Sequence, residues 1–166
     1  MASVRERDRG WNKIQKELKK LNGGDTKIGV QQGEKHKAAS SNKADFWSKR
    51  TSPRSAISDL VTIAAANEFG TKNIPARSFM RSTFDKSLKQ TEAFKGRLYD
   101  RVLAGQLNAG RALGILGEFY TAKVKATITK LRTPPNAAST IKRKKSTNPL
   151  IDTGQLRAGI THVESL

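Results

Sequence analysis

Residues 66–81 read ANEFGTKNIPARSFMR, and this stretch contains the clearest local signals in the chain. A run of apolar residues at helical spacing precedes it, and Gly70 is the left-handed stop that commonly ends a helix. Ile74-Pro75 then predicts a turn, because proline fixes φ and cannot continue a helix. Phe79 follows at the start of the next periodic run. The stretch therefore predicts two helices joined by a rigid turn.

The chain before this stretch predicts a basic helix, a short strand and a long loop. Ser3 and Glu6 fit a capping box, and Gly23-Gly24 ends the helix. Its apolar stripe, at spacings of three and four, is Trp11, Ile14, Leu18 and Leu21. Residues 26–30 alternate as a strand, and residues 31–54 are rich in Lys, Ser and Asn without periodicity.

Three further helices are predicted from apolar spacing. One begins near Ser52-Pro53 or Ser55, with a buried stripe of Ile57, Leu60, Val61, Ala64 and Ala65. The second runs to about Ala104, stops at Gly105, and carries Phe79, Phe84, Leu88, Leu98 and Val102. The third carries Leu113, Leu116, Tyr120, Val124, Ile128 and Leu131, and its glycines favour close helix packing (Gly110, Gly114 and Gly117).

The C-terminal part predicts a loop over 133–149, one helical turn and a final strand. Lys142–Lys145 form a basic cluster on a loop or short helix, and residues 159–163 form the strand. Asp152 or Thr153 is expected to cap the turn that begins at Gly154. The fold class is therefore α+β: a small mixed or antiparallel sheet packed with about three helices. We expect a basic N-terminal helix (1–24) and a single α+β domain (25–166).

The charge is strongly basic but unevenly distributed. The net charge is +18, yet residues 55–85 carry three basic and three acidic residues. Residues 1–54 contribute +8, 86–132 contribute +7, and 133–166 contribute +3. A polyanion such as nucleic acid is one expected partner, because cations gain by releasing counterions from phosphates. Solvated lysine faces beside an acidic protein are the other, and charge alone does not choose between them.

The remaining composition limits the possible classes of protein. Apolar residues make up 36%, mean hydropathy is −0.62, and cysteine is absent, which excludes disulfides and thiolate metal sites. No window approaches a membrane span and no signal peptide is visible, so we expect a soluble protein made inside the cell. His36 and His162 lack metal-ligand spacing, which argues against a metal site.

The sequence contains no strong catalytic motif. Leu150-Ile-Asp-Thr-Gly154 resembles an aspartic protease turn, but such a site needs two facing carboxylates and more chain after the motif than is present here. Glu68, with no second acid or base nearby in sequence, is expected to be a structural hydrogen-bond acceptor. Phe46-Trp47 in the basic loop either stacks on bases or docks on a partner protein, and docking is favoured. We expect no enzyme activity and no cofactor.

Two separated motifs carry a resemblance to a known family. Ile63–Thr71 with Ile74–Arg81 forms the first, and Thr133–Asn136, Ser139–Lys144 and Pro149–Arg157 form the second. Their order and content resemble the tail-completion (tail-terminator) and virion-morphogenesis family of head–tail joining, or neck, proteins of tailed bacteriophages. The resemblance covers roughly residues 55–164.

The resemblance implies a structural virion protein, assembled in the host cytoplasm, at the head–tail junction. Its copies would form a ring, typically of six, which terminates the tail tube and joins it to the head, with packaged DNA passing through the lumen. The implied partners are further copies of the chain, the tail tube protein, head-closure or adaptor proteins near the portal, and sheath or collar proteins. A head-side neck protein shares the motifs, and a basic nucleic-acid-binding module is the alternative of a different class.

The expected contact residues follow from the motifs and from the charge. A ring subunit needs two different patches, and the rigid turn suits one of them. The candidates for subunit or partner contacts are Glu68, Phe69, Gly70, Thr71, Pro75, Arg77, Phe79, Arg81, Phe46 and Trp47. Phe79 either anchors a neighbour or packs in its own core, and Asp152 and Thr153 either cap the last turn or touch a partner. Lys142, Arg143, Lys144 and Lys145 are candidates for DNA or an acidic partner.

Overall fold

The chain folds as a helical body with one small sheet. The computed structural model describes residues 10–30 and 55–166, with side chains from residue 60 onward in the second range. Its elements in order are α1 (Trp11–Gly23), β1 (Asp25–Val30), α3 (Ser55–Phe69), α4 (Arg81–Leu103), α5 (Ala109–Lys130), α6 (Ala138–Lys144), α7 (Gln155–Ala158) and β2 (Ile160–Ser165). The predicted α+β class is confirmed. The Ser3–Glu6 capping box and the loop 31–54 lie outside the described residues.

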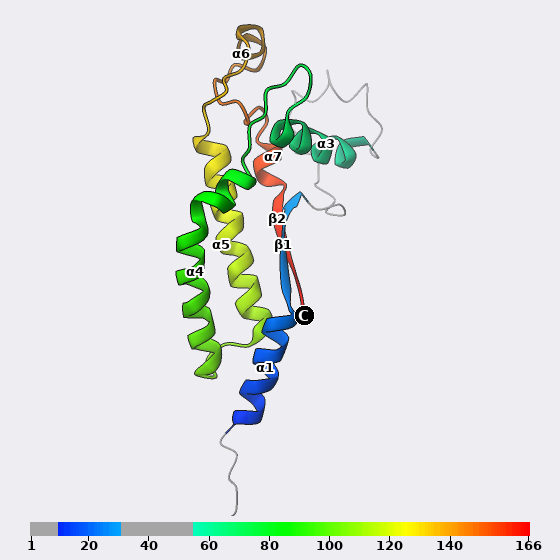
Figure 1. The fold of residues 1–166 in the computed structure, drawn as a ribbon. Helices are drawn as coiled ribbons and strands as arrows, with labels where there is room; N and C mark the ends of the chain where they lie inside the picture. The colour runs from blue at the N-terminus through cyan, green and yellow to red at the C-terminus, as the bar shows by residue number, and fades with distance from the viewer. Residues whose placement is uncertain (1–9, 31–54) are drawn as a thin grey trace, which may run out of the picture.

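Helix α5 is the centre of the fold. The sheet lies along one side of it and α4 along the other, while α1 packs at one end (Figure 1). β1 and β2 pair antiparallel, from Asp25 opposite Ser165 to Val30 opposite Ile160. Segments from near both ends of the sequence therefore form one sheet, as predicted. No helix in the described ranges is long and apolar enough to cross a membrane.

The glycines of α5 let the sheet approach the helix closely. A Cβ on Gly117 would lie 2.6 Å from the His162 Cγ and 2.8 Å from the Thr26 Cγ2. Gly114 faces Glu164, and Gly110 faces Leu166 in the same way. The close packing at these glycines is therefore against the sheet and the residue that follows it, and not against another helix.

The core has two clusters, one toward each end of α5. The cluster near α1 contains Leu21, Leu98, Val102, Leu107, Ala109, Ala112 and Leu113. The cluster near α3 and α7 contains Phe79, Val124, Ile128, Leu150, Leu156 and Ile160. Leu88, which belongs to the predicted apolar pattern of α4, is instead 57% exposed. At the α4–α5 contact the small polar Thr83 is buried, and it donates to Thr127 Oγ1 at 2.6 Å.

The two long helices begin at carboxylates supplied by other helices. Glu17 of α1 accepts from the Ala109 backbone N–H at 2.9 Å, and Asn108 accepts from the Arg111 N–H at 2.8 Å. The bond from Ala109 and a second from Lys20 lower the pKa of Glu17. At the other end of the body, Glu68 of α3 serves α4 in the same way. Since the first N–H groups of a helix have no partner within it, these carboxylates satisfy both helix starts.

Candidate functional site

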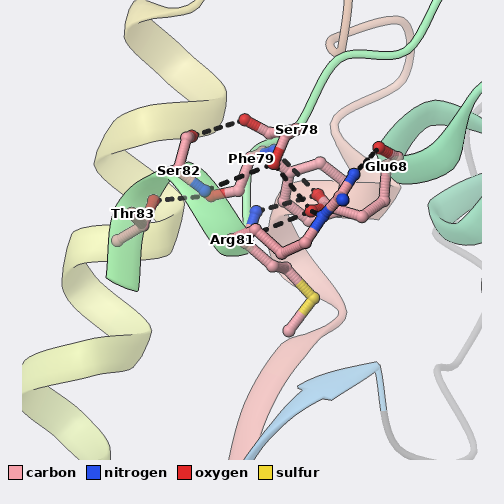
Figure 2. Close-up of polar contacts among 7 residues, drawn as sticks. Glu68, Ser78, Phe79, Arg81, Ser82 and Thr83 are labelled. Atoms are coloured by element: carbon pink, nitrogen blue, oxygen red, sulfur yellow. Dashed lines mark hydrogen bonds and ion pairs between the residues drawn. The ribbon is translucent and has the colours of Figure 1, made fainter. Parts of the chain in front are cut away.

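Glu68, in the last turn of α3, closes the turn of the first motif. Its carboxylate accepts from the backbone N–H groups of Phe79 (2.8 Å), Met80 (2.9 Å) and Arg81 (3.1 Å), where α4 begins (Figure 2). The Ser78 hydroxyl donates to it at 2.8 Å and Arg81 Nε at 3.0 Å. Helix α4 has no side-chain cap of its own, since Met80 occupies its N-cap position. Glu68 is therefore the N-terminal cap of α4, contributed by the preceding helix.

The hydrogen bonds decide the charge state of Glu68. Burial of this side chain, which is in a residue 4% exposed, acts to raise its pKa. The bonds from Met80, Arg81 and Ser78 outweigh burial, so the pKa of Glu68 is lowered and the carboxylate stays ionised. Arg81 also lies over the exposed ring of Phe69, with its guanidinium carbon 4.9 Å from the ring centroid. The site therefore joins the end of α3 to the start of α4 by hydrogen bonds, an ion pair and a cation–π contact.

Arg77 joins the two motifs, which are more than fifty residues apart in the sequence. Its Nε donates to the Pro134 carbonyl at 2.8 Å, and Nη2 donates to the Pro135 carbonyl at 3.0 Å. Nη2 also donates to Asn136 Oδ1 at 3.1 Å, and the Arg77 backbone N–H donates to the Asn67 carbonyl at 2.6 Å. Arg77 is 5% exposed. The Pro-Pro-Asn segment is thus held against the first motif by one guanidinium.

The turn itself has the rigidity that the sequence predicts. Gly70 has φ of 78°, and a Cβ there would lie 2.9 Å from the Ala76 nitrogen, so only glycine fits without a shift. Thr71 and Ile74 exchange backbone hydrogen bonds of 2.8 and 3.3 Å, and Thr71 Oγ1 accepts from the Ile74 N–H at 3.1 Å. Thr71 and Pro75 are exposed.

The predicted contact residues differ in how far they are exposed. Glu68, Arg77 and Phe79 are buried, and Phe79 is 0% exposed within the core cluster near α3. Glu68 and Arg77 form hydrogen bonds within the chain, and Phe79 packs in its own core, which is one of the two alternatives given for it. Of the predicted contact residues, those that remain exposed are Phe69, Thr71, Pro75 and Arg81. Gly70 is half-buried, and Phe46 and Trp47 lie outside the described residues.

Helix α3 also has exposed apolar side chains near the Glu68 site. Leu60 and Ala64 pack on the core, as predicted, but Val61 and Ala65 of the predicted buried stripe are exposed. Three exposed apolar residues are spaced four apart and so lie on one side of the helix, and we define the α3 outer face as Val61, Ala65 and Phe69. Val61 is 40% and Phe69 67% exposed, and Ile63, 48% exposed, lies on another side of α3. The helix contacts mainly α7 and β1, and its last turn meets the start of α4 through Glu68 and Phe69 (Figure 1).

Residues in and beside the second motif also form hydrogen bonds within the chain. Asn148 Oδ1 accepts from the Leu150 and Ile151 N–H groups at 2.9 and 3.1 Å, and its Nδ2 donates to the Thr129 carbonyl at 2.9 Å. Lys144 Nζ donates to the Asn148 carbonyl at 2.6 Å and the Ile151 carbonyl at 2.9 Å. The basic cluster lies on the short helix α6 and its C-cap. Lys142, Arg143 and Lys145 are exposed, whereas Lys144 is not free for a partner.

The predicted side-chain cap of the last helical turn is not formed. Helix α7 begins after Gly154, whose φ is 83°, and no side chain caps it. Asp152 and Thr153 are exposed. Asn148 was missed by the sequence analysis, although an Asn beside a proline is a signal for local turn bonding, and Asn136 was quoted in the second motif without its contact to Arg77.

Comparisons with models of known families, with curated proteins and with solved structures found no match.

Proposed function

We propose that this chain is a structural subunit of a tailed-phage neck, which assembles into a ring that terminates the tail tube and joins the tail to the head. The resemblance of the two motifs supports the proposal, and the α3 outer face is the observation that carries it. An apolar helix face of this kind, in a chain with charge +18, favours a protein partner over water. DNA passes through the lumen of the ring.

The charge distribution favours contact between copies at this face. Copies of so basic a chain repel one another, and the repulsion is smallest where the local charge is balanced. Residues 55–85, which contain α3 and the turn, are the balanced segment. A ring contact is heterologous, so the α3 outer face meets a different patch on the next copy. The face of the sheet turned from α5, where Val163 is 47% exposed opposite Lys27, supplies that patch.

The first test is assembly of the purified chain. Its mass is measured by light scattering after size exclusion, and its shape by negative-stain electron microscopy. We expect a closed ring from the natural sequence and a monomer from the Val61→Ser/Phe69→Ser double variant. Leu88→Ser, which removes an equally exposed apolar side chain from α4, is the matched control and keeps the ring. Circular dichroism confirms that all three fold.

Monomers at every concentration, or rings that survive the α3 substitutions as well as they survive the control, would overturn this assignment. The second test is electron microscopy of phage particles that lack the protein. Overlong or unjoined tails beside full heads support a tail terminator. Heads that leak DNA instead point to a head-side stopper, and normal particles contradict a neck role.

A further inference from the structure

A cavity of about 480 Å³ opens between the start of α4 and the end of α5. Its charged lining is entirely basic. Arg77 precedes α4, Lys86 lies on α4, and Lys130 and Arg132 come from the end of α5 and the residues after it. The neutral lining includes the hydroxyl side chains of Ser78, Ser82 and Thr127, and none of the described residues that line the cavity carries a carboxylate.

Arg77 is a buried cation without a counter-ion in the described chain. All its side-chain hydrogen bonds go to neutral oxygens, from Pro134, Pro135, Asn136 and Asn67. Burial lowers the pKa of its guanidinium, and no carboxylate offsets this. Buried charges in proteins are usually paired, because desolvation of an unpaired ion costs several kcal/mol. A positive charge held in place beside a cavity therefore favours an anion in that cavity.

The neighbouring groups add to the positive potential. Lys86 and Lys130 are exposed and form no ion pair among the described residues, and Arg132 donates to the carbonyls of Thr129 and Leu131. The Asn136 Nδ2 group, on the amide that accepts from Arg77, is buried and donates to nothing in the described part of the chain.

We propose that this cavity is a binding site for a phosphate group, either free or in a nucleic-acid backbone. A single protein carboxylate neutralises one of the four cations, whereas a phosphate with its neighbours along a strand neutralises several. The charge outside the cavity matches a polyanion too, since residues 123–157 contain nine basic residues and one acid. The lining comes from one copy of the chain, so the site and its test do not require the proposed ring.

The test compares two double variants that lose equal charge. Lys86→Gln/Lys130→Gln removes two exposed cations from the cavity, and Lys13→Gln/Lys19→Gln removes two exposed cations from α1. Binding of a fluorescent DNA duplex is measured by anisotropy across a salt series. We expect the cavity variant to lose at least about tenfold in affinity at 0.1 M salt, with a shallower salt dependence, because each lost phosphate contact removes released counterions. The α1 variant stays within about threefold.

Inorganic phosphate alone distinguishes the source of the ligand. The midpoint of thermal unfolding is measured in phosphate and in chloride of equal ionic strength, because a ligand that binds only the folded state raises it. A rise in the natural protein that the cavity variant loses identifies free phosphate as a ligand. A DNA effect without this rise identifies the nucleic-acid backbone. Equal behaviour of the two variants in both assays overturns the proposal, as does binding of polyglutamate in place of DNA and phosphate.

Discussion

Replacement of Glu68 by alanine tests whether one carboxylate holds α3, the turn and α4 together. The substitution removes the acceptor for three backbone N–H groups and for the side chains of Ser78 and Arg81. The Phe79 N–H is fully buried at this point, so water does not replace the carboxylate there. Ser78 and Arg81 are partly exposed and recover bonds to solvent.

The expected loss is about 3–5 kcal/mol of unfolding free energy. Loss of a helix N-cap costs about 0.5–2 kcal/mol, and each buried donor left unpaired costs about 1–3 kcal/mol. The fully buried donor at Phe79 is counted at the full cost, the N-cap value covers the partly buried donors at Met80 and Arg81, and the ion pair with the exposed Arg81 adds at most about 1 kcal/mol, so the expected loss lies in the middle of this range. Glu68→Gln keeps the shape and one acceptor oxygen, so we expect it to lose about half as much.

Urea unfolding followed by circular dichroism measures this loss. Glu92→Gln, which breaks the exposed ion pair with Lys95, is the control and should change stability by less than about 0.5 kcal/mol. A Glu68→Ala variant within about 1 kcal/mol of the natural protein, with an unchanged urea slope, would refute the capping role. It would mean that α4 begins without this carboxylate.

The pH dependence has a definite sign. The pKa of Glu68 is lowered in the folded chain from its ordinary value of 4.5. A lowered pKa means that the contribution of the carboxylate is complete above the unfolded value and is lost as pH falls through the folded one. The stability gap between the natural protein and Glu68→Gln should therefore be constant near neutral pH and narrow below about pH 4.5.

Two further substitutions test the hydrogen bonds of Arg77 to the second motif and the close contact between α5 and the sheet. Arg77→Lys should cost about 2–3 kcal/mol in urea unfolding, because one ammonium does not reach all the oxygens that the planar guanidinium bonds; a cost below about 0.5 kcal/mol would contradict this. Gly117→Ala should lower the thermal midpoint, with a cost of about 1–3 kcal/mol, because its Cβ would meet His162. Gly96→Ala, on the open surface of α4, should gain about 0.5–1 kcal/mol, and a shift of the same sign in both would count against the reasoning.

Much of the fold could be predicted because its signals are local. Gly70 and Gly105 end α3 and α4 where the sequence places them, both with positive φ. The third apolar pattern became α5, and the weak strand at 26–30 paired with the last residues of the chain. Such signals depend on residues within one turn or one strand of each other, so no tertiary information is needed.

The packing face of α3 could not be predicted in the same way. This helix is apolar around most of its circumference, so periodicity does not identify the side that packs. The position of α7 and β1 decides it, and they cover Leu60 and Ala64 but leave Val61 and Ala65 exposed. An apolar residue on such a helix is a poor predictor of burial.

The partners of the motif residues were also beyond sequence reasoning. Glu68 was expected to accept hydrogen bonds, but its donors lie up to thirteen residues ahead, across a turn whose shape is set by Gly70. Arg77 bonds a segment more than fifty residues away, which only the return of the chain along α5 brings near. The missing side-chain cap of α4 is a signal that an outside acceptor was needed.

Several motif residues are buried, so the surfaces that stay available for partners lie elsewhere on the molecule. Glu68 and Phe79 are buried and hold the end of α3 against the start of α4, and Arg77 holds the second motif beside them. What they leave outside is of two kinds: an apolar face on a charge-balanced segment, and a basic cavity with further cations around it. The first suits another copy of a strongly positive chain, since contact elsewhere brings like charges together. The second repels another copy and attracts a polyanion, so the two surfaces can be occupied at once without competition.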